Sequence, residues 1–98
     1  MKNKTFVIGS MSCADEIRKV AEYLMSVGCE VKYVRPQPDK NLSELIVEAY
    51  NHISESDDII AVPKADGSFG TGTMYELGFA EFLGKRIFKW RDERNELS

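Results

Sequence analysis

Cysteine is scarce in this chain, which has Cys13 and Cys29 and no others among its 98 residues. Two cysteines are too few for a disulfide scaffold, and they show neither Cys-x-x-Cys nor Cys/His metal-binding spacing. We therefore expect no metal site, and a reducing cytoplasm is the compartment that fits this usage best.

The chain also lacks a basic excess and long apolar runs. Thirteen basic and sixteen acidic side chains give a formal charge of −3, which argues against polymeric nucleic acid as a partner. The apolar run near the N-terminus covers only residues 6–8, too short for a signal peptide, and no stretch approaches the roughly 20 residues that cross a bilayer. A soluble, cytoplasmic protein that does not bind a membrane is expected.

The composition is that of a folded chain, with 43% hydrophobic residues, 30% charged residues and three prolines. Such a composition is neither disordered nor of low complexity. Because the length falls below the usual size of one domain, we expect residues 1–98 to form a single domain with a polar tail at 91–98.

Short apolar runs alternate with amphipathic stretches. Strands are expected at residues 5–9, 29–34, 58–62 and 86–90, and helices at residues 12–28, 41–53 and 73–83. Strands separated by helices of this length predict an α/β protein: a single-domain, Rossmann-like (flavodoxin-like) three-layer sandwich with about four parallel strands in the order 2-1-3-4. In such a sheet, ligands bind beyond the carboxyl ends of the strands, here after Ile8 and Val62.

The first candidate binding segment is Gly9-Ser10-Met11-Ser12, which joins a strand to a helix. Free backbone N–H groups at a helix start favour an anion or a hydroxyl-rich ligand. The motifs GxGxxG and GxxxxGK[ST] are absent here, so a dinucleotide or P-loop site is not supported. The alternative is a tight turn with a helix cap, since Ser12 and Asp15 have capping-box spacing, as Asn41 and Glu44 do before the second helix.

The second candidate segment is glycine-rich and runs from Gly72 and Thr73 to Glu76 at the start of the third helix. Glu76 is expected in the first turn. One interpretation is structural, because Thr73 and Glu76 also have capping-box spacing. The other is a carboxylate nucleophile or base over a bound sugar, as in glycosyl transfer.

The segment Gly72-Thr73-x-x-Glu76-Leu77-Gly78-x-Ala80-x-x-x-Gly84-Lys85-x-Ile87 follows an Asp57-to-Val62 strand and an opening Phe6-to-Ser10 strand. In this arrangement the chain resembles the nucleoside 2-deoxyribosyltransferase-like family, which includes nucleotide N-glycoside hydrolases. The resemblance covers roughly residues 5 to 90.

The resemblance implies that Glu76 attacks the anomeric carbon of a nucleoside or nucleotide, and that water or another base resolves the glycosyl-enzyme. Gly9 and Ser10 would line the sugar or phosphate end, and Met11, Gly72 and Thr73 complete the expected substrate-binding set. No metal or organic cofactor is implied.

The family's pattern is not complete in this chain. Family enzymes commonly carry a tyrosine where this chain has Phe6 and an aspartate where it has Ala49. A non-catalytic nucleotide-binding module of the same fold is therefore the alternative. Family members also complete the site with a partner's C-terminal region, for which this tail offers only Asn95 and Ser98.

Three further features of the sequence carry predictions. The third helix is apolar around much of its circumference, which predicts a homodimer through it. His52, the single histidine, is expected to be a surface residue. Cys13, at the first turn of a helix, raises the alternative of a cysteine phosphocarrier domain, although Lys19 stands where the Cys-x₅-Arg pattern needs arginine.

Overall fold

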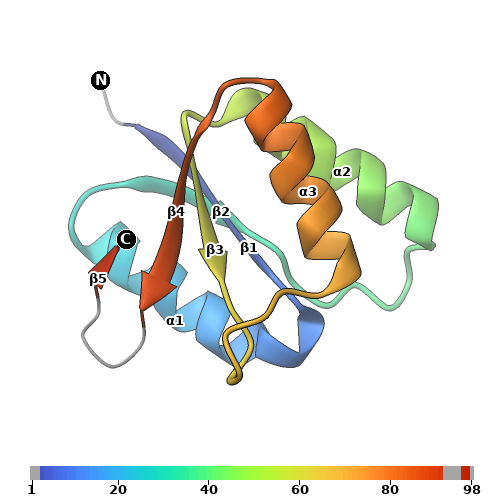
Figure 1. Cartoon of the computed structure of the whole chain (residues 1–98), viewed down its shortest axis with the longest axis horizontal. Helices are drawn as coiled ribbons and strands as arrows, with labels where there is room; N and C mark the ends of the chain where they lie inside the picture. Colours follow the sequence, from blue (N-terminus) through green and yellow to red (C-terminus); the bar gives the residue numbers. More distant parts are fainter. Residues whose placement is uncertain (1–2, 92–95, 98) are drawn as a thin grey trace.

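Strands and helices alternate along the chain in this computed structural model, which describes residues 3–91 and 96–97. The elements in chain order are β1 (Lys4–Gly9), the 3-10 turn η1 (Met11–Cys13), α1 (Ala14–Ser26), β2 (Glu30–Tyr33), α2 (Leu42–Glu55), β3 (Asp58–Val62), α3 (Thr71–Phe82), β4 (Arg86–Arg91) and β5 (Glu96–Leu97). Figure 1 shows their arrangement.

The strands form one sheet in the order β2-β1-β3-β4-β5. The first four are parallel to their neighbours, so the predicted α/β fold with strand order 2-1-3-4 is confirmed. The short strand β5 is antiparallel to β4, with Trp90 opposite Leu97. The tail, for which no structure was predicted, thus adds an edge strand.

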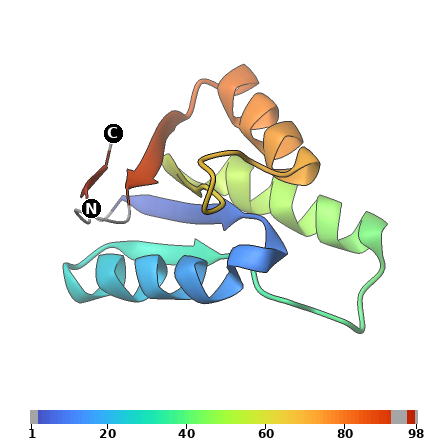
Figure 2. The same cartoon turned by 60° about the horizontal axis from the view of Figure 1, so that its bottom comes forward.

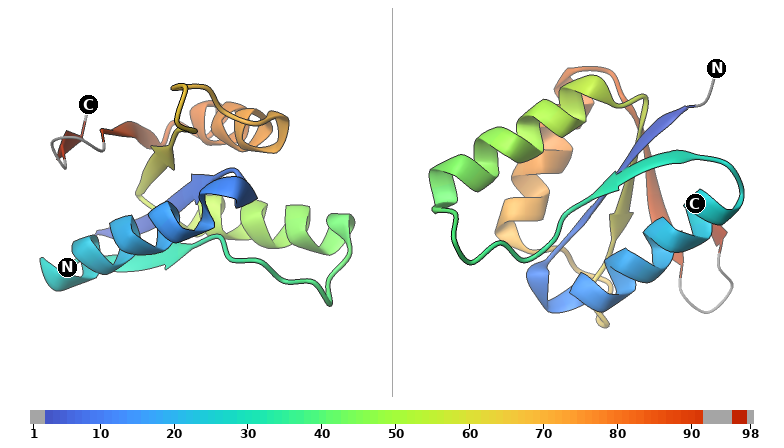
Figure 3. Two further views of the ribbon diagram at one scale, coloured as in Figure 1. Left: turned by 90° about the horizontal axis from the view of Figure 1, so that it is seen from below. Right: turned by 180° about the vertical axis from the view of Figure 1, so that it is seen from behind.

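Helices cover both faces of the sheet, because successive side chains of a strand point to opposite sides. Val7 of β1 points to the face that carries α1, whereas Phe6 and Ile8 point to the face covered by α2 and α3. Figure 3 shows α1 and α3 on opposite sides of the sheet, and α2 and α3 pack against each other. Because both faces are covered, β1 and β3 are almost entirely buried, as continuous apolar runs predict.

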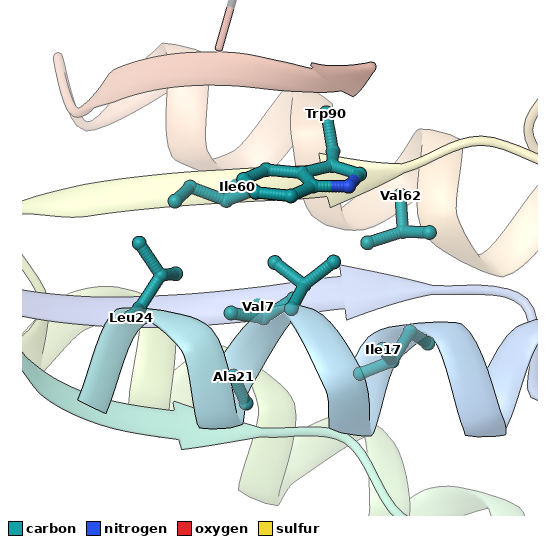
Figure 4. Packing of buried hydrophobic residues seen from close by; sticks show 8 residues of the cluster. Val7, Ile17, Ala21, Leu24, Ile60, Val62 and Trp90 are labelled. Carbon is teal, nitrogen blue, oxygen red and sulfur yellow. The ribbon is translucent and has the colours of Figure 1, made fainter. Parts of the chain in front are cut away.

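The core beneath α1 is built from one stripe of that helix. Ile17, Ala21 and Leu24 recur at helical spacing and point toward the sheet in Figure 4. Trp90 of β4 extends this core and is 4% exposed. Its ring lies 5.9 Å from that of Tyr23, between centroids.

The two predicted helix caps have different outcomes. The capping box before α2 is confirmed, because the Glu44 N–H donates to Asn41 Oδ1 (2.9 Å) and the Asn41 N–H donates to Glu44 Oε1 (3.3 Å). The box expected at Ser12 and Asp15 is wrong. The turn η1 stands between β1 and α1, and Ser10 caps it by accepting from the Ser12 N–H, so α1 begins only at Ala14 without a side-chain cap.

At the amino end of the sheet, Asp58 joins three strands. Its carboxylate accepts from Arg86 Nε (2.6 Å) and Nη2 (3.1 Å) and from Asn3 Nδ2 (3.0 Å). Arg86 belongs to β4, Asp58 to β3, and Asn3 precedes β1. This end of the sheet is therefore fastened by a satisfied, charge-assisted cluster.

None of the described helices combines the length and the apolar character needed to span a membrane.

Candidate functional site

A cavity of about 950 Å³ opens at the carboxyl ends of β1 and β2, between α2 and the start of α3. Its volume lies at the upper end of the range for small-molecule sites. Loops after β1 and β3 contribute to it, as the strand order predicts. A third wall comes from residues 34–40, the extended connection that runs from β2 to the start of α2 in Figure 2.

The structure brings all the sequence-predicted site residues to this cavity. Those that line it are Gly9, Ser10, Met11, Gly72, Thr73 and Glu76. They come from two segments, residues 9–11 and residues 72–76, which are more than 60 positions apart in the sequence. The segments meet because β1 and β3 are neighbours in the sheet. Their roles in binding and chemistry are taken up below as proposals.

Gly9, the last residue of β1, is required by the close approach of β3. A Cβ at this position would lie 2.9 Å from the Val62 carbonyl oxygen, a backbone atom that cannot move aside. A side chain here would push the two strands apart at the mouth of the cavity.

The structural interpretation of Thr73 and Glu76 as a capping box is wrong. The helix α3 begins at Thr71, with Gly70 as its N-cap and no side-chain cap. Thr73 therefore lies within the first turn, where it is 4% exposed. Glu76 lies in the second turn rather than the first, so its carboxylate has no helix end to satisfy.

Glu76 is a partly buried carboxylate without a partner in the part of the chain that the structure describes. None of the other residues in the described part of the chain forms a hydrogen bond or ion pair with it. Burial raises the pKa of Glu76 to about 7, because removal from water penalises the charged form. A carboxyl group poised near neutral pH in a cavity is a typical catalytic feature.

Phe6 and Ala49 form an apolar part of the cavity wall. Both line the cavity, and they are 1% and 6% exposed. Neither side chain carries a polar atom, so hydrogen bonds to a ligand at this wall must come from their neighbours.

A polar cluster on α2 and the connection before it was not predicted as part of the site. Glu48 accepts a hydrogen bond from Gln37 Nε2 (2.9 Å) and pairs with the Lys40 ammonium. His52 lies one turn further along α2, and all four residues line the cavity. The expectation that His52 is a surface residue needs correction, since its side chain is only 24% exposed.

The signal that could have found His52 is its position on the helix. It follows Ala49 by three residues and Glu48 by four, so on the surface of α2 it is a neighbour of both. Ala49 belongs to the buried stripe that packs on the sheet. The Gln37 and Lys40 contacts depend on the path of the connection, which spacing does not reveal.

Cys13 lies outside the cavity lining. Its thiol contacts the Pro63 carbonyl oxygen at 3.8 Å, and the residue packs against the core beneath α1. The residues around this cavity therefore give no support to a cysteine phosphocarrier.

Comparisons with known proteins were made for the sequence and for the fold. No family model matches the sequence, and no curated protein matches it. A 2-deoxyribosyltransferase of Leishmania mexicana is similar in structure, with a TM-score of 0.62 and 23% identity over 89% of this chain. The CMP N-glycosidase BcmB of Clostridium botulinum is also similar, with a TM-score of 0.56 and 25% identity over 88% of this chain.

These similarities assign the fold to a class of small α/β proteins that includes enzymes of the N-glycosidic bond. The chain has the fold of the nucleoside 2-deoxyribosyltransferase-like family, the family that its sequence resembles. It spans 63% of the length of the Leishmania protein and 70% of that of the Clostridium protein.

Proposed function

We propose that this protein cleaves or transfers the N-glycosidic bond of a small nucleoside or nucleotide, with Glu76 as the nucleophile. The observation that carries the proposal is the partly buried Glu76 carboxyl in the cavity wall, which has no partner among the described residues. The structural similarity to a deoxyribosyltransferase and an N-glycosidase supports the type of bond that is broken.

In the proposed reaction, the Glu76 carboxylate attacks the anomeric carbon of the sugar. The bond from that carbon to the base breaks, and its electron pair leaves with the base nitrogen, which takes up a proton. The transition state resembles an oxocarbenium ion and leads to a glycosyl ester on Glu76. Water then yields the free sugar, or a second base yields a new nucleoside.

The two glycine-containing segments hold the sugar side in this proposal. Gly9, Ser10 and Met11 lie opposite the first turn of α3, which carries Gly72 and Thr73. Their backbone groups come close to the ligand because glycine leaves no side chain in between. Backbone N–H groups at the start of α3 suit a hydroxyl or a 5′-phosphate.

A non-catalytic nucleotide-binding module is the second candidate, and Phe6 and Ala49 favour it. Family enzymes carry a tyrosine and an aspartate at these two positions, whereas here the wall is buried and apolar. In this alternative, the cavity binds the same ligands and releases them unchanged.

The test is a panel of deoxynucleosides, their 5′-monophosphates and free bases, with base release or exchange measured by chromatography and binding by thermal shift. We expect turnover in the parent and a loss of about 10³-fold or more in Glu76→Gln, with nearly unchanged affinity, because the amide keeps the shape but cannot attack. The matched control is Glu81→Gln, an exposed site on the same helix, which should keep full turnover.

Two outcomes would contradict the enzyme proposal. Turnover that survives in Glu76→Gln removes its role as nucleophile. A parent that shows thermal shifts but converts no compound of the panel is the binding module instead.

We also propose that the protein forms a homodimer through α3. Met74, Tyr75 and Phe82 of this helix are 55%, 69% and 84% exposed, although large apolar side chains are usually covered. Analytical ultracentrifugation at micromolar concentration should show a dimer, and Phe82→Ser should shift it toward monomer. A parent that sediments only as monomer contradicts this proposal.

A further inference from the structure

His52 is a titratable residue in the cavity wall that the proposed reaction does not yet use. It lies on α2 and lines the same cavity as Glu76. Its ring packs against the Phe6 ring, with centroids 5.2 Å apart and an interplanar angle of 49°. It therefore stands beside Phe6 and one turn from Ala49, next to the apolar part of the wall.

The two ring nitrogens of His52 have different surroundings. Nε2 lies 3.9 Å from Glu48 Oε1, the distance of a loose ion pair when the imidazole is protonated. Nδ1 is buried, and no residue that the structure describes forms a hydrogen bond with it. Buried polar atoms without partners are uncommon in native proteins. Because Nδ1 is out of reach of a bound molecule, a proton exchanged between His52 and a ligand would be carried by Nε2.

Glu48 is held in its charged form. It accepts from Gln37 Nε2 and pairs with the Lys40 ammonium. These contacts lower the pKa of Glu48 below its ordinary value, with the hydrogen bond from Lys40 as the largest cause. The carboxylate that lies 3.9 Å from His52 Nε2 is therefore itself held in place by two neighbours.

Other charged groups line the two pockets that His52 borders. Lys40, from the connection before α2, and Glu76, on α3, line the main cavity. Glu44 and Glu55 of α2 line the neighbouring pocket. Three of these four groups are acidic.

We propose that His52 is the general acid and base of the glycosidic reaction, with Glu48 as its positioning residue. This proposal rests on the proposed function. When Glu76 attacks the anomeric carbon and the bond to the base breaks, the imidazolium gives its proton to the departing base nitrogen. The neutral imidazole then takes a proton from water as the water oxygen attacks the anomeric carbon and releases Glu76.

The experiment compares two leaving groups. The first substrate is the best deoxynucleoside or deoxynucleotide of the panel, whose base leaves only with a proton. The second is 4-nitrophenyl 2-deoxyriboside, whose phenolate leaves without one. The parent, His52→Gln and Glu76→Gln are assayed on both, with Asn51→Gln, an exposed neighbour on α2, as the matched control.

We expect His52→Gln to lose about 10²- to 10⁴-fold in kcat on the nucleoside, the usual contribution of a general acid. The loss on the nitrophenyl substrate should stay below about tenfold. Glu76→Gln should lose activity on both substrates, and Asn51→Gln on neither. Circular dichroism and the unfolding midpoint of each variant establish that it is folded.

A second variant covers the case in which His52→Gln does not fold. Glu48→Gln removes the carboxylate that positions the imidazole, so kcat on the nucleoside should fall with little change in KM, because a general acid must be aligned with the leaving group. The kcat on the nitrophenyl substrate should stay nearly unchanged. An unchanged kcat on the nucleoside counts against the proposal.

The outcomes separate this proposal from the one on which it rests. Equal losses on both substrates in His52→Gln, or no loss on the nucleoside, overturn the acid role while Glu76 keeps its own. Activity that survives Glu76→Gln but follows the leaving-group pattern in His52→Gln overturns the nucleophile alone. A parent that cleaves neither substrate ends both proposals.

Discussion

At the two ends of the sheet, carboxylates that are largely withdrawn from water have opposite surroundings. At the amino end, the Asp58 side chain is 12% exposed and receives three hydrogen bonds, two of them from Arg86. At the carboxyl end, Glu76 lines a cavity and has no partner among the residues that the structure describes. Both groups are removed from water, but only Asp58 is compensated for that removal.

This is the difference that we expect between a group that stabilises the fold and one that takes part in a reaction. A buried carboxylate with matched donors holds elements together. A buried carboxylate without donors destabilises the folded state when the carboxylate is charged. Such groups persist where reactivity matters more than stability. The following variants test this contrast, beginning with the largest expected effect on stability.

The Asp58 cluster should be the more costly one to break. Arg86→Met removes two charge-assisted hydrogen bonds and leaves Asn3 as the remaining donor to Asp58. We expect a loss of about 2 kcal/mol in the free energy of unfolding, the usual range for hydrogen bonds to a charged group. Urea denaturation followed by Trp90 fluorescence measures it, since this residue is 4% exposed in the fold.

The matched control is Arg18→Met, which removes the partner of Glu22 from an exposed pair on α1 (3.5 Å). Exposed pairs of this kind contribute little to stability. Equal losses of unfolding free energy in the two variants would show that the Asp58–Arg86 pair stabilises the fold no more than an ordinary surface pair does.

Replacement of Glu76 should change the free energy of unfolding in the opposite direction. Its folded-state pKa is about 7, raised above the ordinary value of 4.5, so the folded protein binds the proton more tightly than the unfolded chain does. Stability is therefore highest below about pH 4.5 with respect to this group, and it falls as the pH rises toward 7. At pH 8 the charged carboxylate costs of order 1–3 kcal/mol.

The variant Glu76→Gln removes this titration. We expect the variant to be more stable than the parent at pH 8 and nearly equal to it at pH 4.5, measured as the difference between their urea curves at each pH. Glu81→Gln, at an exposed site on the same helix, should show no such pH-dependent difference. A parent and variant that differ equally at both pH values would mean that Glu76 is not destabilised by burial.

The sheet was predictable because its signals are local. Residues 6–8 and 59–62 are continuous apolar runs, and strands covered on both faces require such runs. Asn41 and Glu44 predicted the start of α2 because both halves of a capping box lie within four residues. Glu76 was singled out because the segment from Gly72 to Ile87 resembles the nucleoside 2-deoxyribosyltransferase-like family, a signal that also lies within one short segment.

The rest depends on contacts between distant segments or on residues without a side-chain signal. Gly70 is the N-cap of α3 and has no side chain that could indicate this role. The helix start was therefore predicted two residues too late, and Thr73 was considered as its cap. The polar cluster around Glu48 could not be predicted, because the connection from β2 brings Gln37 and Lys40 to this carboxylate. The periodicity of a sequence predicts which residues share a face of a helix, but it does not predict which loop residues contact that face.

Glu48 lies between the two extremes, since it is paired but about one third exposed. Lys40→Met should leave the urea midpoint nearly unchanged, because water replaces the lost ammonium at so open a site. The pKa of the Glu48 carboxyl, followed by carbon NMR, should nevertheless rise toward its ordinary value, since the Lys40 hydrogen bond is the main cause that lowers it. Lys19→Met, which removes the partner of Glu16 on α1 (3.8 Å), is the control and should leave Glu48 unaffected.

A urea midpoint that falls as far in Lys40→Met as in Arg86→Met would mean that pairing stabilises the cavity wall as it does the amino end of the sheet. A midpoint that stays constant while the pKa rises would mean that Lys40 controls the charge beside His52, and so belongs to the chemistry of the site rather than to the stability of the fold.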